Sequence, residues 1–507
     1  MLNLTPIVRP YFAGLASSLK RISGPSATEE AQRKVLAALL RAARKTLVGE
    51  RHGFGYISRY EQFAARVPIT DYEAIRPLVM RMVAGERNIL WPGICRRFAQ
   101  SSGTSGGKSK YIPVTDDGLR LNHYRGGKLA VAAYLDMYPE SRLFGGKCLI
   151  LGGSFANELK DIPAGVCVGD LSATLIDRIN PLVNLLRVPD KKTALMPDWN
   201  RKLPLLAETA LHADITNISG VPSWFMTVLR AVTEKAGVRT IHEVWPNLEV
   251  FFHGGIAFGP YRDQYREITD PSKMRYIENY NASEGFFAVQ DSEADGQMRL
   301  LTDAGIFYEF IDIDNSLEGP AIPAWQVEPR RTYALVISSC NGLWRYIIGD
   351  TVHIESVEPL RISIAGRTNS FINAFGEELM VWNADAALAA ACRRTGAAAA
   401  NYTAAPVYSS CRTKGHHQWL IEWAEPPACG NEAFADILDS ELQKVNSDYQ
   451  AKRNGNIFLA RLELTEASPG AFDRWLASTG KLGGQRKIPR LANDRHIIDP
   501  IIALMQK

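Results

Sequence analysis

Residues 101–110 read Ser101-Ser102-Gly103-Thr104-Ser105-Gly106-Gly107-Lys108-Ser109-Lys110. The ten residues comprise four serines, one threonine, three glycines and two lysines, so almost every side chain is a hydrogen-bond donor or is absent. Glycines allow consecutive backbone N–H groups to turn toward one concave point, and hydroxyl and ammonium groups add further donors. A flexible Gly/Ser linker is the alternative. The two lysines and the strand-like segments on both sides favour a loop that binds a polyphosphate.

The loop differs from a standard P-loop in its sequence and in the element that comes after it. Gly107-Lys108-Ser109 matches the end of G-x-x-x-x-G-K-[ST], but Ser102 occupies the position of the first glycine. A Walker loop leads directly into a helix, whereas here the next residues, 111–114, are strand-like. We expect the next helix only after Thr115, its N-cap. The sequence therefore predicts a hairpin loop that covers a nucleotide's phosphates from the side.

Composition limits the class of protein. The 507 residues are enough for more than one domain, and 46% apolar with 22% charged residues is typical of globular proteins. The net charge of +4 gives no indication of a nucleic-acid or anionic membrane partner. No apolar run approaches the ~20 residues of a membrane span, and no secretory signal or C-x-x-C pair is visible. We expect a cytoplasmic protein with reduced cysteines and no obligate protein partner.

The chain is expected to have an α/β fold with two domains. Residues 1–365 predict a large N-terminal domain of mixed sheets and helices, and residues 366–507 a small C-terminal α+β domain. Apolar spacing predicts helices over residues 29–44 and 431–453. Apolar runs predict strands, among them residues 147–151 and 244–252.

Other candidate site residues come after expected strands. Gly152-Gly153-Ser154 and Gly254-Gly255 each stand directly after an apolar run, where glycines permit close approach of a ligand. Tyr280-Asn281-Ala282-Ser283-Glu284 forms a Y-x-x-S-E pattern, although a serine and a glutamate at a strand end usually face solvent. Asp350 comes after a glycine at the expected end of a strand and is suited to a ribose diol, with a turn aspartate as the alternative.

The order of these segments is more specific than any one of them. A Ser/Thr/Gly/Lys loop, a Gly-Gly pair, Y-x-x-S-E, Y-x-x-G-D and a G-R joint occur in this order in adenylate-forming enzymes. Within that superfamily the sequence most resembles the auxin-responsive (GH-three) family of acyl acid–amido synthetases. The resemblance extends from Val67 to Arg490 and includes Ile112-Pro113, Tyr346-Ile347-Ile348-Gly349-Asp350 and Gly484-Gln485-Arg486-Lys487-Ile488-Pro489-Arg490. Asn281-Ala282 and Ile347-Ile348 depart from the common family residues and indicate a divergent member.

The resemblance implies a ligase that uses ATP and Mg²⁺. Such an enzyme activates a small carboxylic acid as acyl-AMP, releases pyrophosphate, and transfers the acyl group to an amine that is expected to be an amino acid. The small domain would rotate between the two half-reactions about the G-R joint. The implied ATP-binding residues are Ser101, Ser102, Gly103, Thr104, Ser105, Lys108, Gly254, Gly255, Tyr280, Asn281, Ala282, Ser283, Glu284, Asp350 and Arg367.

Further roles are implied in the same way. Glu284 would bind the metal and would be catalytic together with Lys487 of the small domain. Asn122 and Arg125 would line the acyl site. The amine acceptor would bind near Gly152, Gly153, Ser154 and Phe472.

Three alternatives stay open at this point. An acyl-CoA or carrier-protein ligase would share the adenylation step and deliver the acyl group to a thiol. A family member that has lost catalysis would keep the fold, although the joint presence of the loop, Glu284 and Asp350 disfavours it. A P-loop kinase is disfavoured by Ser102 and by the strand after the loop.

Overall fold

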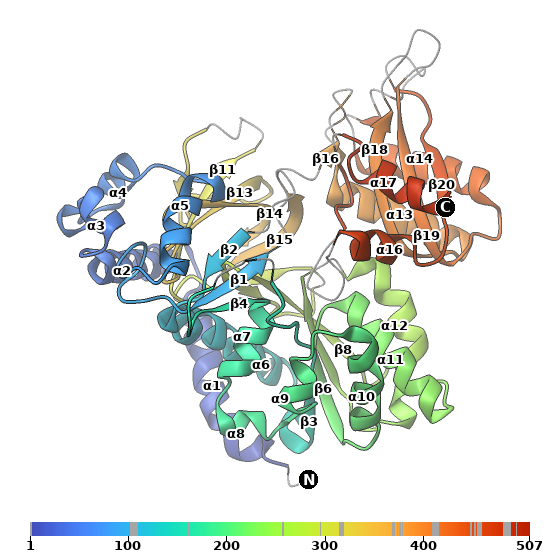
Figure 1. The fold of residues 1–507 in the computed structure, drawn as a ribbon, viewed down its shortest axis with the longest axis horizontal. Helices are drawn as coiled ribbons and strands as arrows, with labels where there is room; N and C mark the ends of the chain where they lie inside the picture. The colour runs from blue at the N-terminus through green and yellow to red at the C-terminus, as the bar shows by residue number, and fades with distance from the viewer. Residues whose placement is uncertain are drawn as a thin grey trace. The chain divides into compact units, whose positions relative to one another are not determined.

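The computed structural model describes residues 3–506 in two compact units (Figure 1). Unit 1 takes in the described residues of 1–103, 107–256 and 265–364, and unit 2 those of 257–264 and 365–507. The residues outside the description are 1–2, 102–109, 158, 160–161, 256–257, 295, 314–318, 368–370, 373, 375–376, 378, 408–414, 447–448, 451–452, 454–458, 480–487, 493 and 507. Among the described helices, none is both long and apolar enough to cross a lipid bilayer.

Twelve α-helices are described before residue 270. They are α1 (Thr5–Arg21), α2 (Pro25–Ala43), α3 (Leu47–Arg51), α4 (Tyr60–Arg66), α5 (Tyr72–Val83), α6 (Tyr124–Met137), α7 (Leu171–Arg178), α8 (Pro181–Asn184), α9 (Lys191–Ala194), α10 (Trp199–Leu211), α11 (Pro222–Ala236) and α12 (Arg262–Ile268). Short 3-10 helices are η1 (Phe54–Tyr56), η3 (Leu143–Gly145), η4 (Ile241–Glu243) and η5 (Gly259–Tyr261), and η2 (Gly118–His123) is a π-helix that leads into α6.

Local signals account for several of these starts. The helix expected over residues 29–44 is confirmed as α2, which begins earlier because Pro25 suits a first helical turn. Asp71 caps α5 by accepting a hydrogen bond from the N–H of Ala74 at 2.9 Å. Thr115 is confirmed as a cap, since its Oγ1 accepts from the N–H of Gly118 at 2.8 Å.

Twelve described strands form one large sheet in the order β12-β11-β13-β14-β15-β10-β9-β8-β7-β6-β3-β5. The strands β5, β3, β6, β7 and β8 run parallel, and β8 to β9 begins the antiparallel part. Their bounds are β3 (Lys147–Ile150), β5 (Arg187–Val188), β6 (Ile215–Gly220), β7 (Val250–Gly254), β8 (Arg275–Ala282), β9 (Gly285–Val289), β10 (Met298–Leu300), β11 (Ile306–Asp312), β12 (Ile322–Pro323), β13 (Thr332–Ser339), β14 (Tyr346–Val357) and β15 (Leu360–Arg367).

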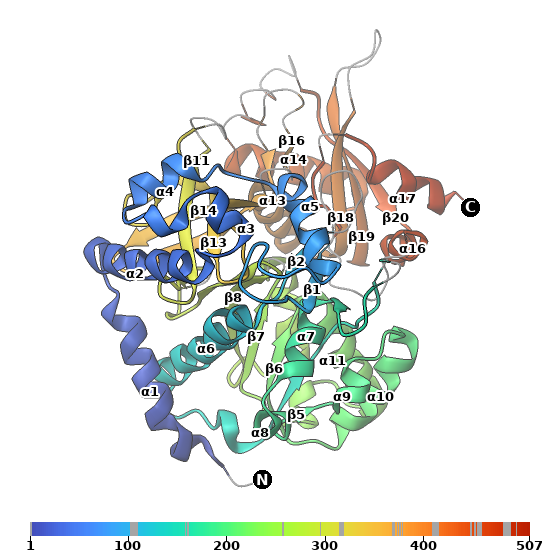
Figure 2. The same ribbon diagram turned by 60° about the vertical axis from the view of Figure 1, so that its left-hand side comes forward.

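Helices cover both faces of the parallel part, because its central strands are apolar on both sides. On β7, Phe252 packs in one core with residues of α1 and α6. The neighbouring Phe251 points to the other face, where its ring lies 5.2 Å from Phe225 of α11 and 5.3 Å from Tyr265 of α12. Figure 2 shows α1 lying alongside α6.

One expected strand is shorter than the sequence suggested. Residues 244–252 were expected to be a strand throughout, but β7 begins only at Val250. Pro246 has no backbone N–H to give to a sheet, and with Asn247 it forms a turn after η4. Trp245 is fully buried and donates its ring N–H to the carbonyl of Ala210 at 2.8 Å. The apolar run therefore includes a core anchor that is not part of the sheet.

Unit 2 is a small α+β layer structure. Its three-stranded sheet has the order β18 (Ala398–Val407), β19 (His416–Glu425) and β20 (Glu463–Ala467). On β19, Trp419 and Ile421 face a core with α13 (Val381–Thr395) and α14 (Asn431–Val445), while Leu420 faces α16 (Ala471–Ser478) and α17 (Ile498–Met505). The short strands β16 (Phe371–Ile372) and β17 (Leu379–Met380) pair with each other. The helix expected over residues 431–453 ends at Val445, because Asn446 is extended and its side chain accepts from the N–H of Tyr449.

Candidate active site

The hairpin expected around the Ser/Thr/Gly/Lys loop is confirmed. Strands β1 (Arg97–Ser101) and β2 (Lys110–Pro113) pair antiparallel, with Ser101 opposite Lys110, and β1 also pairs with β4 (Cys167–Gly169). The loop itself, residues 102–109, lies outside the described residues, as does the Ser101 side chain. The phosphate-binding roles of Ser101, Ser102, Gly103, Thr104, Ser105 and Lys108 therefore stay predictions.

The second strand of the hairpin is attached to α5 through Tyr72. The phenol Oη of Tyr72 accepts a hydrogen bond from the N–H of Tyr111 at 2.8 Å. Burial raises the pKa of Tyr72 to about 12, so the phenol stays neutral at physiological pH. The ammonium of Lys110 lies 5.9 Å from the centre of the same ring, at a distance typical of a cation–π contact. These contacts fix the base of the hairpin.

Two of the expected ATP-site residues meet across the sheet. Tyr280 on β8 donates a hydrogen bond from its Oη to Oδ2 of Asp350 on β14 at 2.6 Å, and both residues are buried. Three strands, β9, β10 and β15, separate β8 from β14 in the sheet order. Asp350 was expected at the end of a strand but lies inside β14, because apolar residues continue that strand to Val357. The Y-x-x-S-E and Y-x-x-G-D segments thus belong to one site.

Glu284 lies in the tight turn between β8 and β9. The two strands pair up to Ala282 and Gly285, which leaves Ser283 and Glu284 as the turn, and Glu284 is buried. Asn341 holds this turn in place: its Nδ2 donates to the carbonyl of Glu284 at 3.3 Å, and its Oδ1 accepts from the N–H of Thr115 at 3.1 Å. Sequence reasoning did not single out Asn341, which lies in the turn after β13.

A buried hydroxyl lies close to both carboxylates. The Oη of Tyr346 has no hydrogen-bond partner among the described residues. Burial raises its pKa well above the usual value, and the carboxylates of Glu284 and Asp350 act in the same direction. A buried polar atom without a partner is costly unless a ligand supplies one. Phosphate or ribose oxygens are ligand groups that would accept this hydrogen bond.

The carboxylate donors here suit Mg²⁺, which prefers oxygen ligands and keeps several of its waters. Among the described residues no group of three or more His, Cys, Asp or Glu side chains is arranged to hold a metal ion. A magnesium ion held by one carboxylate together with nucleotide phosphates needs no such group. Glu284 therefore fits the expected role.

Gly254 ends β7 beside the Y-x-x-S-E segment, and Gly255 comes directly after the strand. A Cβ at Gly254 would lie 2.3 Å from the carbonyl oxygen of Asn279 and 2.9 Å from Oδ1 of Asn281. Gly255 has a φ of +86°, which favours glycine. Packing against β8 and the backbone conformation thus require these glycines, while their contact with adenine stays a prediction.

The two expected acyl-site residues contact other parts of unit 1. Nδ2 of Asn122 donates hydrogen bonds to the carbonyls of Phe286 and Ala304, the latter at 2.8 Å. Its Oδ1 accepts a hydrogen bond from the N–H of Phe286. Arg125 forms an ion pair with Asp303 at 2.5 Å. Both side chains hold α6 and η2 against β9 and the residues after β10, and their acyl-site role stays a prediction.

Gly152, Gly153 and Ser154 come after β3 as expected, but protein groups fill the space beside the glycines. A Cβ at Gly152 would lie 2.3 Å from Cδ1 of Ile176, and one at Gly153 would lie 1.8 Å from Oδ2 of Asp170. The same Oδ2 accepts from the N–H of Ser154 at 3.1 Å. Lys202 of α10 is also here, and its Nζ donates to the carbonyl of Gly152 at 2.5 Å. Neither Asp170 nor Lys202 was singled out from the sequence.

The remaining candidates are on the C-terminal side of the chain. Arg367 ends β15, but its side chain is not described, and Lys487 lies outside the described residues. Phe472 of α16 is fully buried in unit 2, within the core that α16 and α17 form with Leu420 of β19. The proposed roles of these three residues in catalysis or acceptor binding stay predictions.

A large α/β unit with buried Asp350 and Glu284 and a hairpin below the Ser/Thr/Gly/Lys loop, together with a small α+β unit, is the arrangement expected of an adenylate-forming enzyme. Family models agree in order along the chain: the GH3 family N-terminal domain matches residues 25–274, the central domain residues 299–367 and the C-terminal domain residues 382–496. The chain belongs to the GH3 family, which is the GH-three family of the sequence resemblance.

Relatives are similar over nearly the whole chain. The indole-3-acetic acid-amido synthetase GH3.8 of Oryza sativa subsp. indica is 22% identical, over 87% of this chain and 84% of the relative. The probable indole-3-acetic acid-amido synthetase GH3.1 of Oryza sativa subsp. japonica is 21% identical, over 94% and 89%.

Solved structures share the fold. The AtGH3.15 acyl acid amido synthetase in complex with 2,4-DB matches with a TM-score of 0.77 at 18% identity, over 96% of this chain and 95% of that chain. A 2-hydroxyisobutyryl-CoA ligase in the postadenylation state with 2-HIB-AMP matches with a TM-score of 0.60 at 13% identity, over 96% and 94%. The large and the small unit both belong to this common architecture.

Proposed function

We propose that this protein is an ATP-dependent acyl acid–amido synthetase, a carbon–nitrogen ligase. It activates a carboxylic acid as an acyl-adenylate and transfers the acyl group to an amine, for which an amino acid is the expected substrate. The observation that carries the proposal is the hydrogen bond between Tyr280 and Asp350, because it joins two separate expected ATP-site motifs within unit 1. The rice relatives are amido synthetases, which favours an amine over a thiol as the acceptor.

The first half-reaction replaces a poor leaving group. A carboxylate oxygen attacks the α-phosphorus of ATP, a new P–O bond forms, the bond to the β-phosphate oxygen breaks, and pyrophosphate leaves. The product is an acyl-AMP whose carbonyl now carries AMP as its leaving group. Positioning and charge neutralisation are what such a step requires from the protein.

The described residues suit this task. Asp350 accepts hydrogen bonds from the ribose hydroxyls, with Tyr280 fixing the carboxylate through its hydrogen bond. Glu284 would hold Mg²⁺, which would supply neutralisation of the phosphate charge. The Tyr346 hydroxyl donates to an oxygen of the nucleotide. Beyond the described side chains, the family resemblance implies that the loop of residues 102–109 would bind the phosphates and that Arg367 and Lys487 would add positive charge.

In the second half-reaction a neutral amine attacks the acyl carbonyl, the C–N bond forms, the C–O bond to AMP breaks, and the nitrogen gives up a proton. We propose that the acceptor binds at the carboxyl end of β3, near Gly152, Gly153 and Ser154. Phe472 of unit 2 is a further proposed contributor. The cytoplasmic location expected from the composition stays a prediction.

The test is acid-dependent ATP–pyrophosphate exchange with a panel of aromatic, indolic and aliphatic carboxylic acids. Amines and thiols are then added to the acids that support exchange. Exchange with subsequent amide formation is the expected result. Thioester in place of amide would overturn the acceptor assignment, and the absence of exchange with every acid, despite ATP binding, would overturn the proposal as a whole.

The metal role of Glu284 has its own test. Glu284→Gln keeps the shape of the side chain but removes its charge, so we expect exchange to fall by at least about 100-fold at saturating Mg²⁺. Glu243→Gln changes an exposed glutamate of η4 in the same unit, and its exchange rate should stay within about twofold of wild type. Exchange in Glu284→Gln that matches the control would exclude this role.

A further inference from the structure

Lys202 is a buried cation that forms no ion pair with any acidic residue the structure describes. Its residue is 2% exposed, and its Nζ makes one hydrogen bond, to the uncharged carbonyl of Gly152 at 2.5 Å. Its ammonium also lies 5.9 Å from the centre of the Trp199 ring. No carboxylate of a described residue lies within ion-pair distance of the nitrogen. An ammonium has three N–H donors, and burying it without neutralisation is costly.

The acid near Lys202 is Asp170. It favours the charged ammonium through space, but the larger effect is burial, which lowers the pKa of Lys202 to about 8. Oδ2 of Asp170 already accepts from the N–H of Ser154. At neutral pH the lysine is therefore mostly charged in a site that does not neutralise it.

The place of Lys202 in the fold is one where ligands bind. Chain order leads from β3 to β5 on one side of β3, and then to β6 on its other side, with all three strands parallel. Open α/β sheets bind ligands outside the carboxyl ends of strands at such a switch point. Gly152 is at the carboxyl end of β3, and Trp199 of α10 and Trp224 of α11 lie beside each other with ring centres 5.7 Å apart.

A second buried cation, Arg187 on β5, does not contact the segment after β3 in the way that Lys202 does. Nη1 of Arg187 on β5 donates to the carbonyl of Pro189, and its Nε and Nη2 have no partner among the described residues. Arg187 is paired with Cys148, which lies four residues before Gly152 and so about 13 Å of extended chain away from it. Lys202 is the cation that contacts the switch point itself.

We propose that Lys202 binds the carboxylate of the amine acceptor, so that the site selects amino acids over simple amines. This inference rests on the proposed function. A carboxylate supplies the missing negative charge and two oxygens for the remaining N–H groups. The acid substrate is a less suitable occupant, because its carboxylate attacks phosphorus and a strong ion pair would reduce its nucleophilicity.

The test compares acceptors that differ only in the carboxylate, such as leucine with isopentylamine and phenylalanine with phenethylamine. Amide formation is measured for wild type, Lys202→Met and Lys202→Arg, and each rate is divided by that protein's own acid-dependent exchange rate. Lys191→Met is the matched control, since Lys191 on the neighbouring α9 is partly exposed and pairs with Asp177.

We expect Lys202→Met to lower kcat/KM on the order of 10- to 100-fold for the amino acids and by less than about threefold for the amines. Lys202→Arg should recover part of the loss with amino acids, and Lys191→Met should behave as wild type with both. Equal losses with both acceptors would indicate a base or a structural role and would overturn the inference. A raised KM for the acid in the exchange reaction would assign the cation to the acid instead. Absence of exchange in the wild type would fault the proposed function, not this inference.

Discussion

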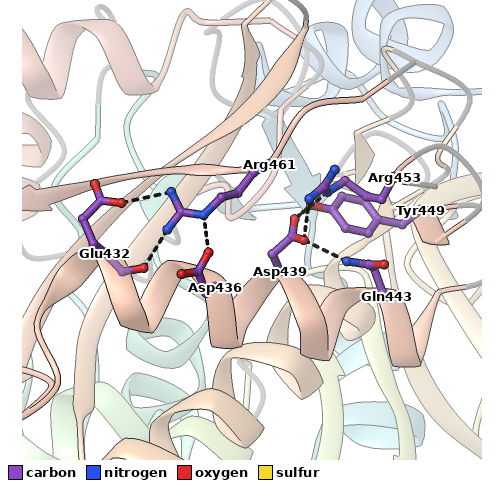
Figure 3. Close-up of polar contacts among 7 residues, drawn as sticks. All are labelled: Glu432, Asp436, Asp439, Gln443, Tyr449, Arg453 and Arg461. Atoms are coloured by element: carbon purple, nitrogen blue, oxygen red, sulfur yellow. Dashed lines mark hydrogen bonds and ion pairs between the residues drawn. The ribbon is translucent and has the colours of Figure 1, made fainter. Parts of the chain in front are cut away.

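Arg453 in unit 2 and Lys202 in unit 1 are both buried cations, but among the residues that the structure describes only Arg453 has a carboxylate partner. Figure 3 shows Asp439 on α14 at the centre of a set of donors: Nε and Nη2 of Arg453 each lie 2.8 Å from one of its oxygens, and the Tyr449 hydroxyl and the Gln443 amide donate to it as well. The Arg453 and Asp439 side chains are only 9% and 6% exposed. Lys202 is equally buried and donates to one backbone carbonyl.

The difference separates a structural charge from a charge kept for a ligand. Asp439 and Arg453 neutralise each other and tie the chain after Asn446 to α14, so nothing further is needed in that part of unit 2. At Lys202 the cost of burying a charge is not offset by any described carboxylate. Proteins retain such uncompensated groups at functional sites, where a ligand completes the arrangement.

The largest expected effect on the free energy of unfolding comes from breaking the buried ion pair between Asp439 and Arg453. Asp439→Asn leaves the Arg453 guanidinium buried without its counter-charge, so we expect the free energy of unfolding of unit 2 to fall by about 3 kcal/mol or more. Urea unfolding combined with hydrogen exchange of the α14 amides measures this loss and locates it. A loss below about 1 kcal/mol would mean that the Asp439–Arg453 pair contributes little to stability, which would contradict its structural role and the contrast with Lys202.

Removing the unpaired charge of Lys202 should leave the free energy of unfolding at pH 7 unchanged or raise it. The pKa of Lys202 is lowered from 10.5 to about 8 in the folded protein, so between these pH values the unfolded chain binds more protons than the folded one. Stability gained from deprotonating Lys202 therefore rises with pH, by up to about 1.4 kcal/mol per pH unit. Lys202→Met lacks this titration. Urea unfolding from pH 7 to 10.5 should show the variant at least as stable as wild type at pH 7, with wild type gaining on it above pH 8. A pH-independent difference would contradict this.

The smallest effect is expected at the exposed ion pair in the same close-up. Arg461 pairs with Glu432 at 3.0 Å and with Asp436 at 2.5 Å, but the Glu432 side chain is 91% exposed (Figure 3). Glu432→Gln should change the free energy of unfolding by less than about 1 kcal/mol, and less still in 0.5 M salt. This variant is the matched control for Asp439→Asn, and an effect as large as that of Asp439→Asn would show that burial does not distinguish the two pairs.

Much of the fold was predictable where a local signal decides it. The α2 and α5 helices, the cap at Thr115 and the β1–β2 hairpin all result from capping residues, proline and apolar spacing within a few positions. Local signals failed where apolar residues serve packing without joining a strand, as at Trp245, and where a polar side chain ends a helix early, as at Asn446. At Trp245 a contact with the distant Ala210 outweighs local propensity, whereas at Asn446 a local hydrogen bond from Tyr449 ends the helix.

By itself, the sequence determined the order of the motifs and therefore the family, because each motif is a short run of residues whose types fit a ligand. It also determined which residues carry charge and which hydroxyls are present. Only the tertiary structure decided that Tyr280 meets Asp350, that Asn341 holds the Glu284 turn, and that Lys202 is buried at the end of β3. The physical reason is that hydrogen bonds between residues far apart in the chain depend on strand order, and burial of a charge depends on everything packed around it.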